Sequence, residues 1–597
     1  MSVVSARSTM TTVSSILKSG NLRGNLQASN KNRVTFELPK NLSQILINYE
    51  QGTERKNYQA LVLTLKEANI KDIEFLALLQ EVKTCISQLN NDHAELVDSL
   101  LQVSWIKRNK EATDAYKAFL EDLVCVHTYH CMRVIQRLIS FLTIEEVGQK
   151  WEDNKPCEQD IVVMNHIHNV FSKFLKIIPM SNDLLLKSLK DKYPWRKKSS
   201  YLHQRYLYFL LQITEYAPQL RTDILLTIVE KLTSLDVHIS REVILDYRRE
   251  LEDDEEEEIF QMDSENNTEI KDHPLAHTLD ICMDMFMTYI YDCCHPDGKM
   301  NQDNVKKMYF ELLQCFEKII LPTEWPSQIQ FVMFYFCSFN TGIAKAFLSW
   351  LWQKVVNENG QTHTNIRQVS ICYIESLLAR GNFITFSLLT DYIKKMSVWI
   401  NEYIKSHNKP EHAYCDVSAH AVFYSMCKAV FYVVAFKSRD LTSTPENLKF
   451  LENLGLGNMV TCNLNPLRAC DARFVQRFAD VMRDYEIVYC HSKINDNLRN
   501  NLPVIQTTKK FVKQLEVFYP FDAYVLLQSS EKIKPIYQEY QAANPALRSK
   551  EILNTENSNM ENDEDDYMDD FGTPHPEDSV INPLMEQCSS PPNFMET

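Results

Sequence analysis

Hydrophobic residues recur along most of this chain at the spacing of one helix face. The clearest case lies within residues 221–237, where positions i, i+3, i+4 and i+7 are Leu225, Ile228, Val229 and Leu232. Residues 365–381 repeat this stripe, and Gly381 stands where a glycine in the left-handed conformation commonly ends a helix. The pattern predicts a series of helices that each bury one side.

Prolines divide the predicted helices at regular intervals. Pro179 and Pro218 each stand between two apolar helices and lie 39 residues apart, and Pro322 marks a further junction. A period of roughly 40 residues is typical of the helix pairs of HEAT repeats. We therefore predict an all-α fold, a HEAT-repeat-like α-solenoid of roughly ten helix pairs. The alternative is a non-repetitive helical fold in which the proline spacing is a coincidence.

The scarcity of glycine argues against most catalytic folds. The chain has 11 glycines in 597 residues, where average usage would supply about forty. Phosphate-binding loops, dinucleotide fingerprints and nucleophile elbows all need glycine where the backbone turns sharply or approaches a ligand. We therefore expect the function to reside on surfaces and tails.

Composition divides the chain into five parts. We predict a disordered N-terminal arm, HEAT-like helical repeats, an acidic disordered loop, further HEAT-like repeats and an acidic disordered tail, over residues 1–40, 41–249, 250–273, 274–549 and 550–597. Runs of like charge repel one another and bury no apolar area, which favours disorder in the loop and the tail. The run in the loop is Glu252, Asp253, Asp254, Glu255, Glu256, Glu257 and Glu258.

The formal net charge of −16 is concentrated in those two acidic segments, so the helical body is nearly neutral. Binding of nucleic acid through counterion release needs clustered lysine and arginine side chains. A protein partner is therefore expected, and the sequence leaves direct contact with DNA open.

The cysteines and the apolar windows indicate a chain of the cytoplasm or nucleus without membrane contact. None of the 16 cysteines forms a CxxC pair, and most stand in apolar helical runs, as buried reduced thiols do. The first 15 residues are polar, so no secretory signal is expected. The window 419–436 is interrupted by His420, Ser425 and Lys428, which favours a buried helix over a membrane span.

No motif predicts a catalytic, cofactor-binding or metal site. His166 and His168 point to different faces of a helix, and no cysteine or acid at ligand spacing accompanies His127 and His130. We interpret these histidines as core or groove residues.

A basic cluster that ends in two serines is the strongest candidate site. It follows Trp195 and consists of Arg196, Lys197, Lys198, Ser199 and Ser200. One interpretation is that a serine hydroxyl caps the helix that starts there. In the other, phosphorylation of a serine reverses the charge that a partner meets, and the same cations could face the acidic loop.

Two further short motifs lie near the chain ends. Ser590 precedes a proline in the tail and is a candidate for proline-directed phosphorylation. Residues 33–36, RVTF, resemble a phosphatase-docking tetrapeptide, which would make the chain a phosphatase-targeting scaffold.

Several long blocks in the second half carry a more specific resemblance. They include HTLDICMDMFMTYIYDCC, NIRQVSICYIESLLARGNFI, CDVSAHAVFYSMCKAVFYVVAF and VFYPFDAYVLLQSSEKIKPIYQEY, in this order. From about residue 100 to 540 the chain resembles the RNA polymerase I-specific transcription initiation factor family, also called TIF-IA.

The resemblance implies a non-enzymatic HEAT-repeat protein without cofactors in the nucleus and nucleolus. It implies binding to the stalk region of RNA polymerase I and bridging to promoter-bound core factor, a selectivity factor that contains the TATA-binding protein. It also implies control by protein kinases and phosphatases, with a serine-rich patch in polymerase contact; Ser199 and Ser200 are the nearest feature here. The alternative is a HEAT-repeat nuclear transport receptor or adaptor.

Overall fold

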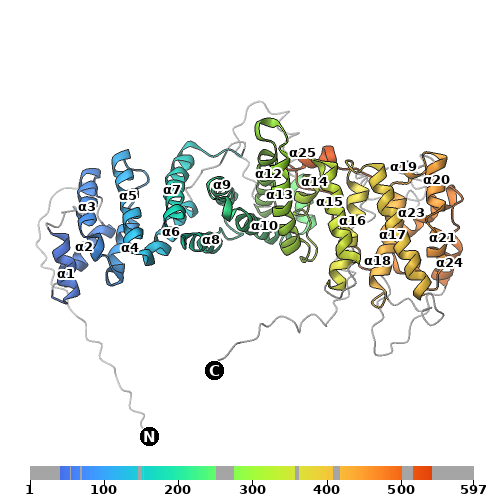
Figure 1. Cartoon of the computed structure of the whole chain (residues 1–597), viewed down its shortest axis with the longest axis horizontal. Helices are drawn as coiled ribbons and strands as arrows, with labels where there is room; N and C mark the ends of the chain where they lie inside the picture. Colours follow the sequence, from blue (N-terminus) through green and yellow to red (C-terminus); the bar gives the residue numbers. More distant parts are fainter. Residues whose placement is uncertain are drawn as a thin grey trace, which may run out of the picture. The chain divides into compact units, whose positions relative to one another are not determined.

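The computed structural model describes residues 41–53, 55–67, 70–144, 151, 154–249, 274–356, 362–407, 417–499 and 515–540. Within these ranges the chain is helical and has no β-strand, which confirms the predicted all-α fold class (Figure 1). The predicted arm, acidic loop and acidic tail lie outside the described residues, and so do the RVTF motif and Ser590.

The chain divides into two compact units, residues 1–134 and 135–597, with the boundary inside helix α6 (Cys131–Ser140). In the first unit, Trp105 and Phe75 stack on Tyr116 with ring centroids 5.0 and 5.8 Å away, and all three side chains are buried. The helices before α6 are α1 (Leu42–Glu50), α2 (Arg55–Glu67), α3 (Asp72–Thr84), η1 (Ile86–Gln88), η2 (Asn91–His93), α4 (Ala94–Gln102), α5 (Lys110–Val126) and η3 (Thr128–His130).

The second unit begins with helices that meet at the predicted prolines. Pro179 separates α7 from α8, and Pro218 opens the short turn between α9 and α10, which confirms both junctions. The four apolar residues predicted to share a face of α10 are all buried. The elements are η4 (Phe141–Thr143), α7 (Glu158–Ile177), α8 (Ser181–Asp191), α9 (Ser200–Tyr216), η5 (Pro218–Leu220) and α10 (Arg221–Val237), followed by helical residues 241–249.

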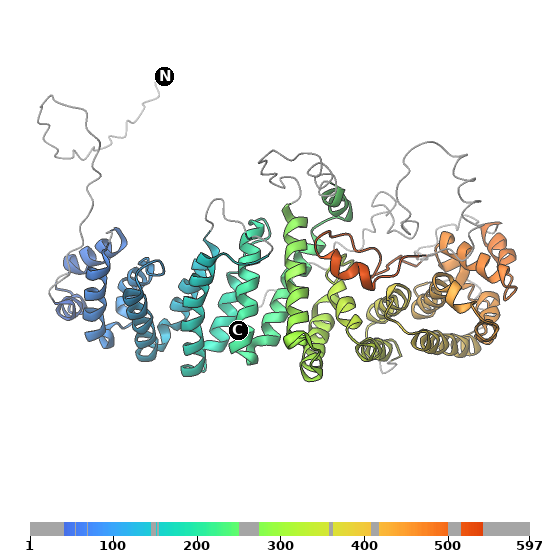
Figure 2. The same cartoon turned by 90° about the horizontal axis from the view of Figure 1, so that it is seen from above.

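The second unit continues with helices that pack against their neighbours, as Figures 1 and 2 both show. Pro322 lies between η7 and α14, as predicted. The elements are α12 (Pro274–Cys294), η6 (Pro296–Gly298), α13 (Gln302–Cys315), the π-helix η7 (Phe316–Ile320), α14 (Phe331–Ser338), α15 (Thr341–Val356), α16 (Thr364–Arg380), α17 (Phe386–His407), α18 (Ala421–Phe436), α19 (Ser438–Leu441), α20 (Pro445–Glu452), α21 (Leu456–Thr461), α22 (Pro466–Ala469), α23 (Ala472–Asp484), α24 (His491–Arg499), α25 (Ser530–Ile533) and η9 (Lys534–Ile536).

Helix α18 is the most deeply buried helix of this unit. It packs against α16, α17 and α23, and nearly every one of its side chains is buried. Lys428 stays inside because its Nζ lies 2.8 Å from a carboxylate oxygen of Glu375 on α16. A buried cation needs such a partner. The prediction that window 419–436 forms a buried helix is confirmed.

Residues 515–540, here called the strap, run back over the second unit instead of continuing the helical series (red in Figure 2). The buried carboxylate of Asp280 on α12 accepts hydrogen bonds from the N–H groups of Leu527, Gln528 and Ser529, at 2.9–3.0 Å. This buried acid thus accepts hydrogen bonds from main-chain N–H groups that have no partner within a helix. Burial raises the pKa of this carboxyl, and the strap N–H bonds oppose that rise.

A second buried carboxylate is linked to the strap through the loop that precedes α14. Asp236 at the end of α10 accepts the N–H groups of Ser327, Gln328 and Ile329, within 3.1 Å. The Gln328 side chain in turn accepts the N–H of Val525 in the strap at 3.2 Å. Burial raises the pKa of Asp236 to about 6 against these bonds. Two loops and one helix end are joined in this way.

Gly381 ends α16 for a reason that the sequence pattern did not reveal. The helix stops at Arg380 as predicted, but Gly381 has φ −77° and is not left-handed. Its backbone pairs with Tyr537 of the strap, and a Cβ atom here would lie 3.0–3.1 Å from Ile384 and Phe383. The glycine therefore provides space for the Ile384 and Phe383 side chains of the following turn, and the predicted left-handed cap is wrong.

Replacing Asp280 by asparagine should destabilise the second unit by at least about 2 kcal/mol, because each buried donor left unpaired costs roughly 1–3 kcal/mol. Urea unfolding measures the loss, and amide hydrogen exchange should accelerate in residues 525–530. Asp292→Asn is the control, since Asp292 is exposed on the same helix. Equal stability of the two variants would contradict this role of Asp280.

Candidate protein-interaction site

The junction between α8 and α9 displays a tryptophan on the surface. Trp195 is 62% exposed, although a side chain of this size is normally largely buried. The N–H of Lys198 donates to its carbonyl oxygen at 2.8 Å, and Nε2 of His203 lies 3.2 Å from the same oxygen. The main chain of this turn is therefore fixed, and the exposed ring projects from a rigid support.

Cations surround the exposed ring. The guanidinium carbon of Arg196 and the Nζ of Lys197 lie 5.7 and 5.6 Å from the Trp195 ring centroid, within cation–π range. Lys197 and Lys198 are exposed and Arg196 is half-buried. Helix α8 adds exposed cations at Lys187 and Lys190, and the exposed Lys192 follows its end.

The lysines of α8 extend the predicted cluster into a wider surface. Lys190 forms an ion pair with Glu230 at 2.7 Å. The Lys231 Nζ lies 5.8 Å from the ring centroid of Tyr193. We call residues 187, 192 and 195–198 the Trp195 surface. Its combination of one aromatic side chain and several cations suits an acidic partner surface.

The two serines lie at the start of a helix, as the sequence predicted, but the Ser199 hydroxyl does not cap that helix. Ser199 is the N-cap residue of α9, yet its side chain makes no capping hydrogen bond. Its Oγ is buried and has no hydrogen-bond partner among the described residues. The capping interpretation is therefore wrong for Ser199. Ser200 is the first residue of α9 and is half-buried.

Three of the histidines considered in the sequence, His127, His130 and His168, have structural hydrogen-bond partners. His127 and His130 lie 2.9 and 3.0 Å from the carbonyl oxygens of Ile86 and Leu89. His168 lies between the Tyr216 hydroxyl and the Gln212 side chain, and burial lowers its pKa to about 4. Within the described ranges, no three potential ligands come together as a metal site would require.

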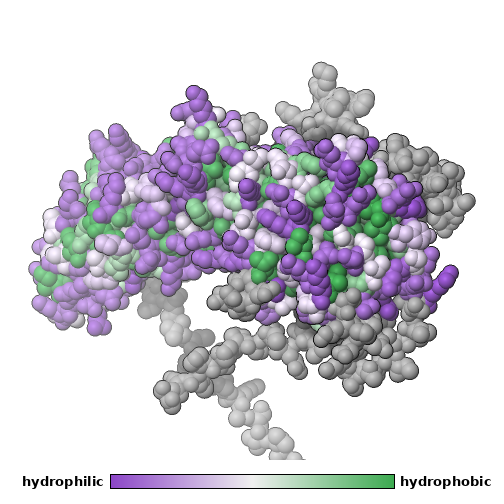
Figure 3. Space-filling view, turned by 45° about the vertical axis from the view of Figure 1, so that its right-hand side comes forward, coloured by the Kyte–Doolittle hydropathy of each residue, from purple (hydrophilic) through white to green (hydrophobic). Residues whose placement is uncertain are grey.

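One face of the molecule shows a mixture of hydrophilic and hydrophobic residues. On the face drawn in Figure 3, hydrophilic side chains alternate with small hydrophobic areas. Among the helices that the structure describes, none has the length and apolar character needed to cross a membrane.

Comparison with known proteins decides the family. A profile described as "RNA polymerase I specific transcription initiation factor RRN3" matches residues 38–545. The chain belongs to the RRN3 family. This family assignment confirms the resemblance seen in the sequence and favours a transcription initiation factor over a transport receptor.

Relatives of the RRN3 family match along most of their length. A mouse protein named "RNA polymerase I-specific transcription initiation factor RRN3" is 30% identical, with 88% of this chain and 84% of the relative covered. A Schizosaccharomyces pombe protein with the corresponding name is 23% identical, with 78% and 79% covered.

A solved structure of the RRN3 family has the same fold. It is titled "Crystal Structure of RNA Polymerase I Transcription Initiation Factor Rrn3" and aligns with a TM-score of 0.65 at 18% identity, covering 84% of this chain and 98% of its own.

The family consists of initiation factors and not of enzymes, and a factor for a nuclear polymerase is a nuclear protein.

Acid should weaken the fold around the Trp195 turn through His203. This side chain is 1% exposed, and burial lowers its pKa to about 4. In the unfolded chain the His203 ring takes up a proton near pH 6.5, whereas in the folded protein it stays neutral down to about pH 4. The free energy of unfolding therefore decreases as the pH falls below about 6.5. We expect His203 alone to contribute a loss of about 2 kcal/mol between pH 7 and 5.

Urea unfolding at several pH values tests this expectation. His203→Gln should remove that part of the acid dependence, and His238→Gln, at an exposed position, should leave it unchanged. An unaltered acid dependence in His203→Gln would contradict the assignment.

Proposed function

We propose that this chain binds the stalk region of RNA polymerase I and bridges the enzyme to promoter-bound core factor at ribosomal RNA genes, in the nucleolus. Membership of the RRN3 family is the observation that carries this proposal. The names of the relatives associate them with RNA polymerase I, and the helical body offers surfaces instead of a catalytic centre.

The Trp195 surface is the part of the chain that we assign to polymerase contact. Aromatic and arginine side chains contribute most of the binding energy of protein interfaces, particularly when rigid neighbours hold them. Here the Trp195 turn is fixed by two bonds to its carbonyl, and Arg196 lies against the ring. The cations around it would raise the rate of encounter with an acidic surface.

Phosphorylation by protein kinases, and its reversal by phosphatases, would control this contact. A phosphate adds about 1.5 to 2 negative charges, and Ser200 follows Lys197 and Lys198 by three and two residues in the sequence. The same charge at the first residue of α9 is compatible with the helix, because the N-terminus of a helix favours anions. The modification would therefore change the surface without disturbing the fold. The tail residue Ser590 stays a predicted second site.

Trp195→Ala should weaken binding to purified RNA polymerase I at least tenfold, since truncating an interface tryptophan removes a large buried contact. Fluorescence anisotropy of the labelled chain at physiological salt measures the affinity. Phe310→Ala is the matched control, because Phe310 is 67% exposed on α13. Equal affinities of the two variants would remove the Trp195 surface from the polymerase interface.

Ser200→Asp should weaken polymerase binding at least fivefold and leave the melting temperature equal or slightly higher. The carboxylate opposes the cations that a partner meets, whereas the α9 dipole favours it by about 0.3–1 kcal/mol. Thermal unfolding and the same anisotropy titration check both parts. Ser200→Asn is the neutral control, and tight binding by Ser200→Asp would contradict the proposed switch.

A further inference from the structure

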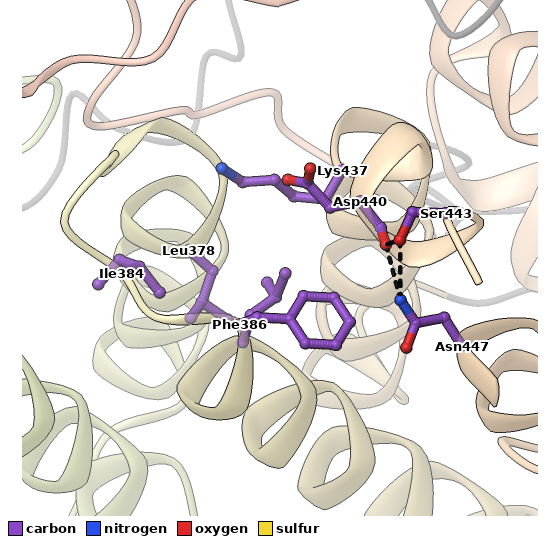
Figure 4. A pocket seen from close by; sticks show the side chains of 8 residues that line it. Leu378, Ile384, Phe386, Lys437, Asp440, Ser443 and Asn447 are labelled. Carbon is purple, nitrogen blue, oxygen red and sulfur yellow. Dashed lines mark hydrogen bonds between the residues drawn. The ribbon is translucent and has the colours of Figure 1, made fainter.

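A cavity of about 400 Å³ lies where α16 ends, α17 begins and α18 ends (Figure 4). One wall is apolar and the other is polar. The apolar wall consists of Leu378, Ile384, Phe386 and Leu389, and the polar wall of Lys437, Asp440, Ser443 and Asn447. In Figure 4 the Lys437 side chain reaches across the top of the cavity.

Most polar groups of this cavity are occupied with one another. The Asn447 side-chain nitrogen donates to the Asp440 carbonyl at 3.0 Å and lies 3.1 Å from the Ser443 Oγ. The Ser443 hydroxyl donates to the same carbonyl at 2.9 Å. The Lys437 amine is different, because its hydrogen bond goes to the strap.

Lys437 is a buried lysine whose described hydrogen-bond partner is neutral. Its side chain is 6% exposed, and its Nζ donates to the amide oxygen of Gln538. An amide oxygen accepts a hydrogen bond from an ammonium and from a neutral amine alike. Gln538 therefore holds the nitrogen in position but does not fix its charge.

Burial has a larger effect on the pKa of Lys437 than the charged groups around it. Asp440 favours the ammonium, the buried Arg380 opposes it, and burial exceeds both, so the pKa of Lys437 is lowered to about 8. Arg380 itself is paired with Asp522 at 2.7 Å. At pH 7.4 a lysine of this pKa is about 20% neutral, against about 0.1% for an ordinary lysine.

Lys428 on the same helix shows the contrast. It is also buried, but its Nζ lies 2.8 Å from the Glu375 carboxylate, and its neighbours Cys372, Glu375 and Tyr519 together raise its pKa despite burial. Lys428 keeps its proton and offers no lone pair. The two lysines differ in their neighbours, because Lys428 has a carboxylate, a thiol and an aromatic ring within reach, whereas the described hydrogen bond of Lys437 goes to an amide.

We propose that Lys437 is a site of covalent acylation, at which a small acyl thioester transfers its acyl group to the amine inside this cavity. The lone pair of the neutral amine attacks the thioester carbonyl, a C–N bond forms and the C–S bond breaks. The thiolate leaves and takes up the proton that the nitrogen loses. The apolar wall of Leu378, Phe386 and Leu389 receives the acyl group.

Acylation of Lys437 would change the contacts at the end of the strap. The amide nitrogen retains one N–H for Gln538 but carries no charge. Tyr540, at the last described position, packs against Phe436 with centroids 5.5 Å apart. Acylation would therefore alter the contact between α18 and the chain that leads into the tail. This inference is independent of the proposed polymerase contact.

Labelling of the folded full-length chain with N-acetyl-S-acetylcysteamine from pH 6 to 10, followed by peptide mass spectrometry, tests the proposal. At pH 7.4 we expect Lys437 to be modified about tenfold faster than the exposed Lys449, because the larger neutral fraction outweighs the lower nucleophilicity of a weaker base. The rate at Lys437 should level off above about pH 8. Lys428 should stay unmodified.

Gln538→Glu is the decisive variant. A carboxylate at this position would pair with the ammonium, so modification at pH 7.4 should fall at least fivefold and the plateau should move to higher pH. Modification of Lys437 slower than Lys449, a rate that still rises at pH 10, or labelling that appears only in urea would overturn the proposal. So would an unchanged rate in Gln538→Glu when circular dichroism shows that variant to be folded.

Discussion

Buried carboxylates that accept main-chain N–H groups are the interactions on which the second unit depends. Loops normally stay at the surface because their backbone groups have no partner inside. Asp236 and Asp280 each accept three consecutive N–H groups, one set from residues 327–329 and one from residues 527–529. Each carboxylate thus makes it possible to bury a turn that joins elements far apart in sequence.

This arrangement joins helices of the second unit that are not neighbours in the series. In a repeat array, by contrast, each repeat contacts only its neighbours. The strap contacts α12, α14 and α16. It is bonded to Asp280 on α12 and to Arg380 on α16. A partner that docks on such a body loses little binding energy to ordering it.

Much of the helical framework was predictable because it follows from local pattern. The stripe of Leu225, Ile228, Val229 and Leu232 is buried as expected, and helix junctions occur at Pro179, Pro218 and Pro322. The strap was not predictable, since residues 515–540 have no period and their partners lie up to about 250 residues away. One signal was present: Asp280 stands among apolar residues in the sequence LDICM.

The candidate site was predictable only in part. The run of Arg196, Lys197 and Lys198 marked the correct junction, but the exposure of Trp195 depends on the turn that His203 and Lys198 hold. Ser199 does not cap α9 because its hydroxyl is buried, where it has no hydrogen-bond partner among the described residues. Gly381 shows the same limit, because the side chains that leave no room for a Cβ atom there, Ile384 and Phe383, take their positions only in the folded turn.

The central claim is that this chain acts by presenting a rigid surface around Trp195 to RNA polymerase I. Hydrogen–deuterium exchange of the chain, alone and in complex with the purified polymerase, tests it most directly. The account predicts new protection in residues 187–203 and unchanged, slow exchange in the strap. Protection confined to other segments, or a strap that becomes ordered only in the complex, would contradict it.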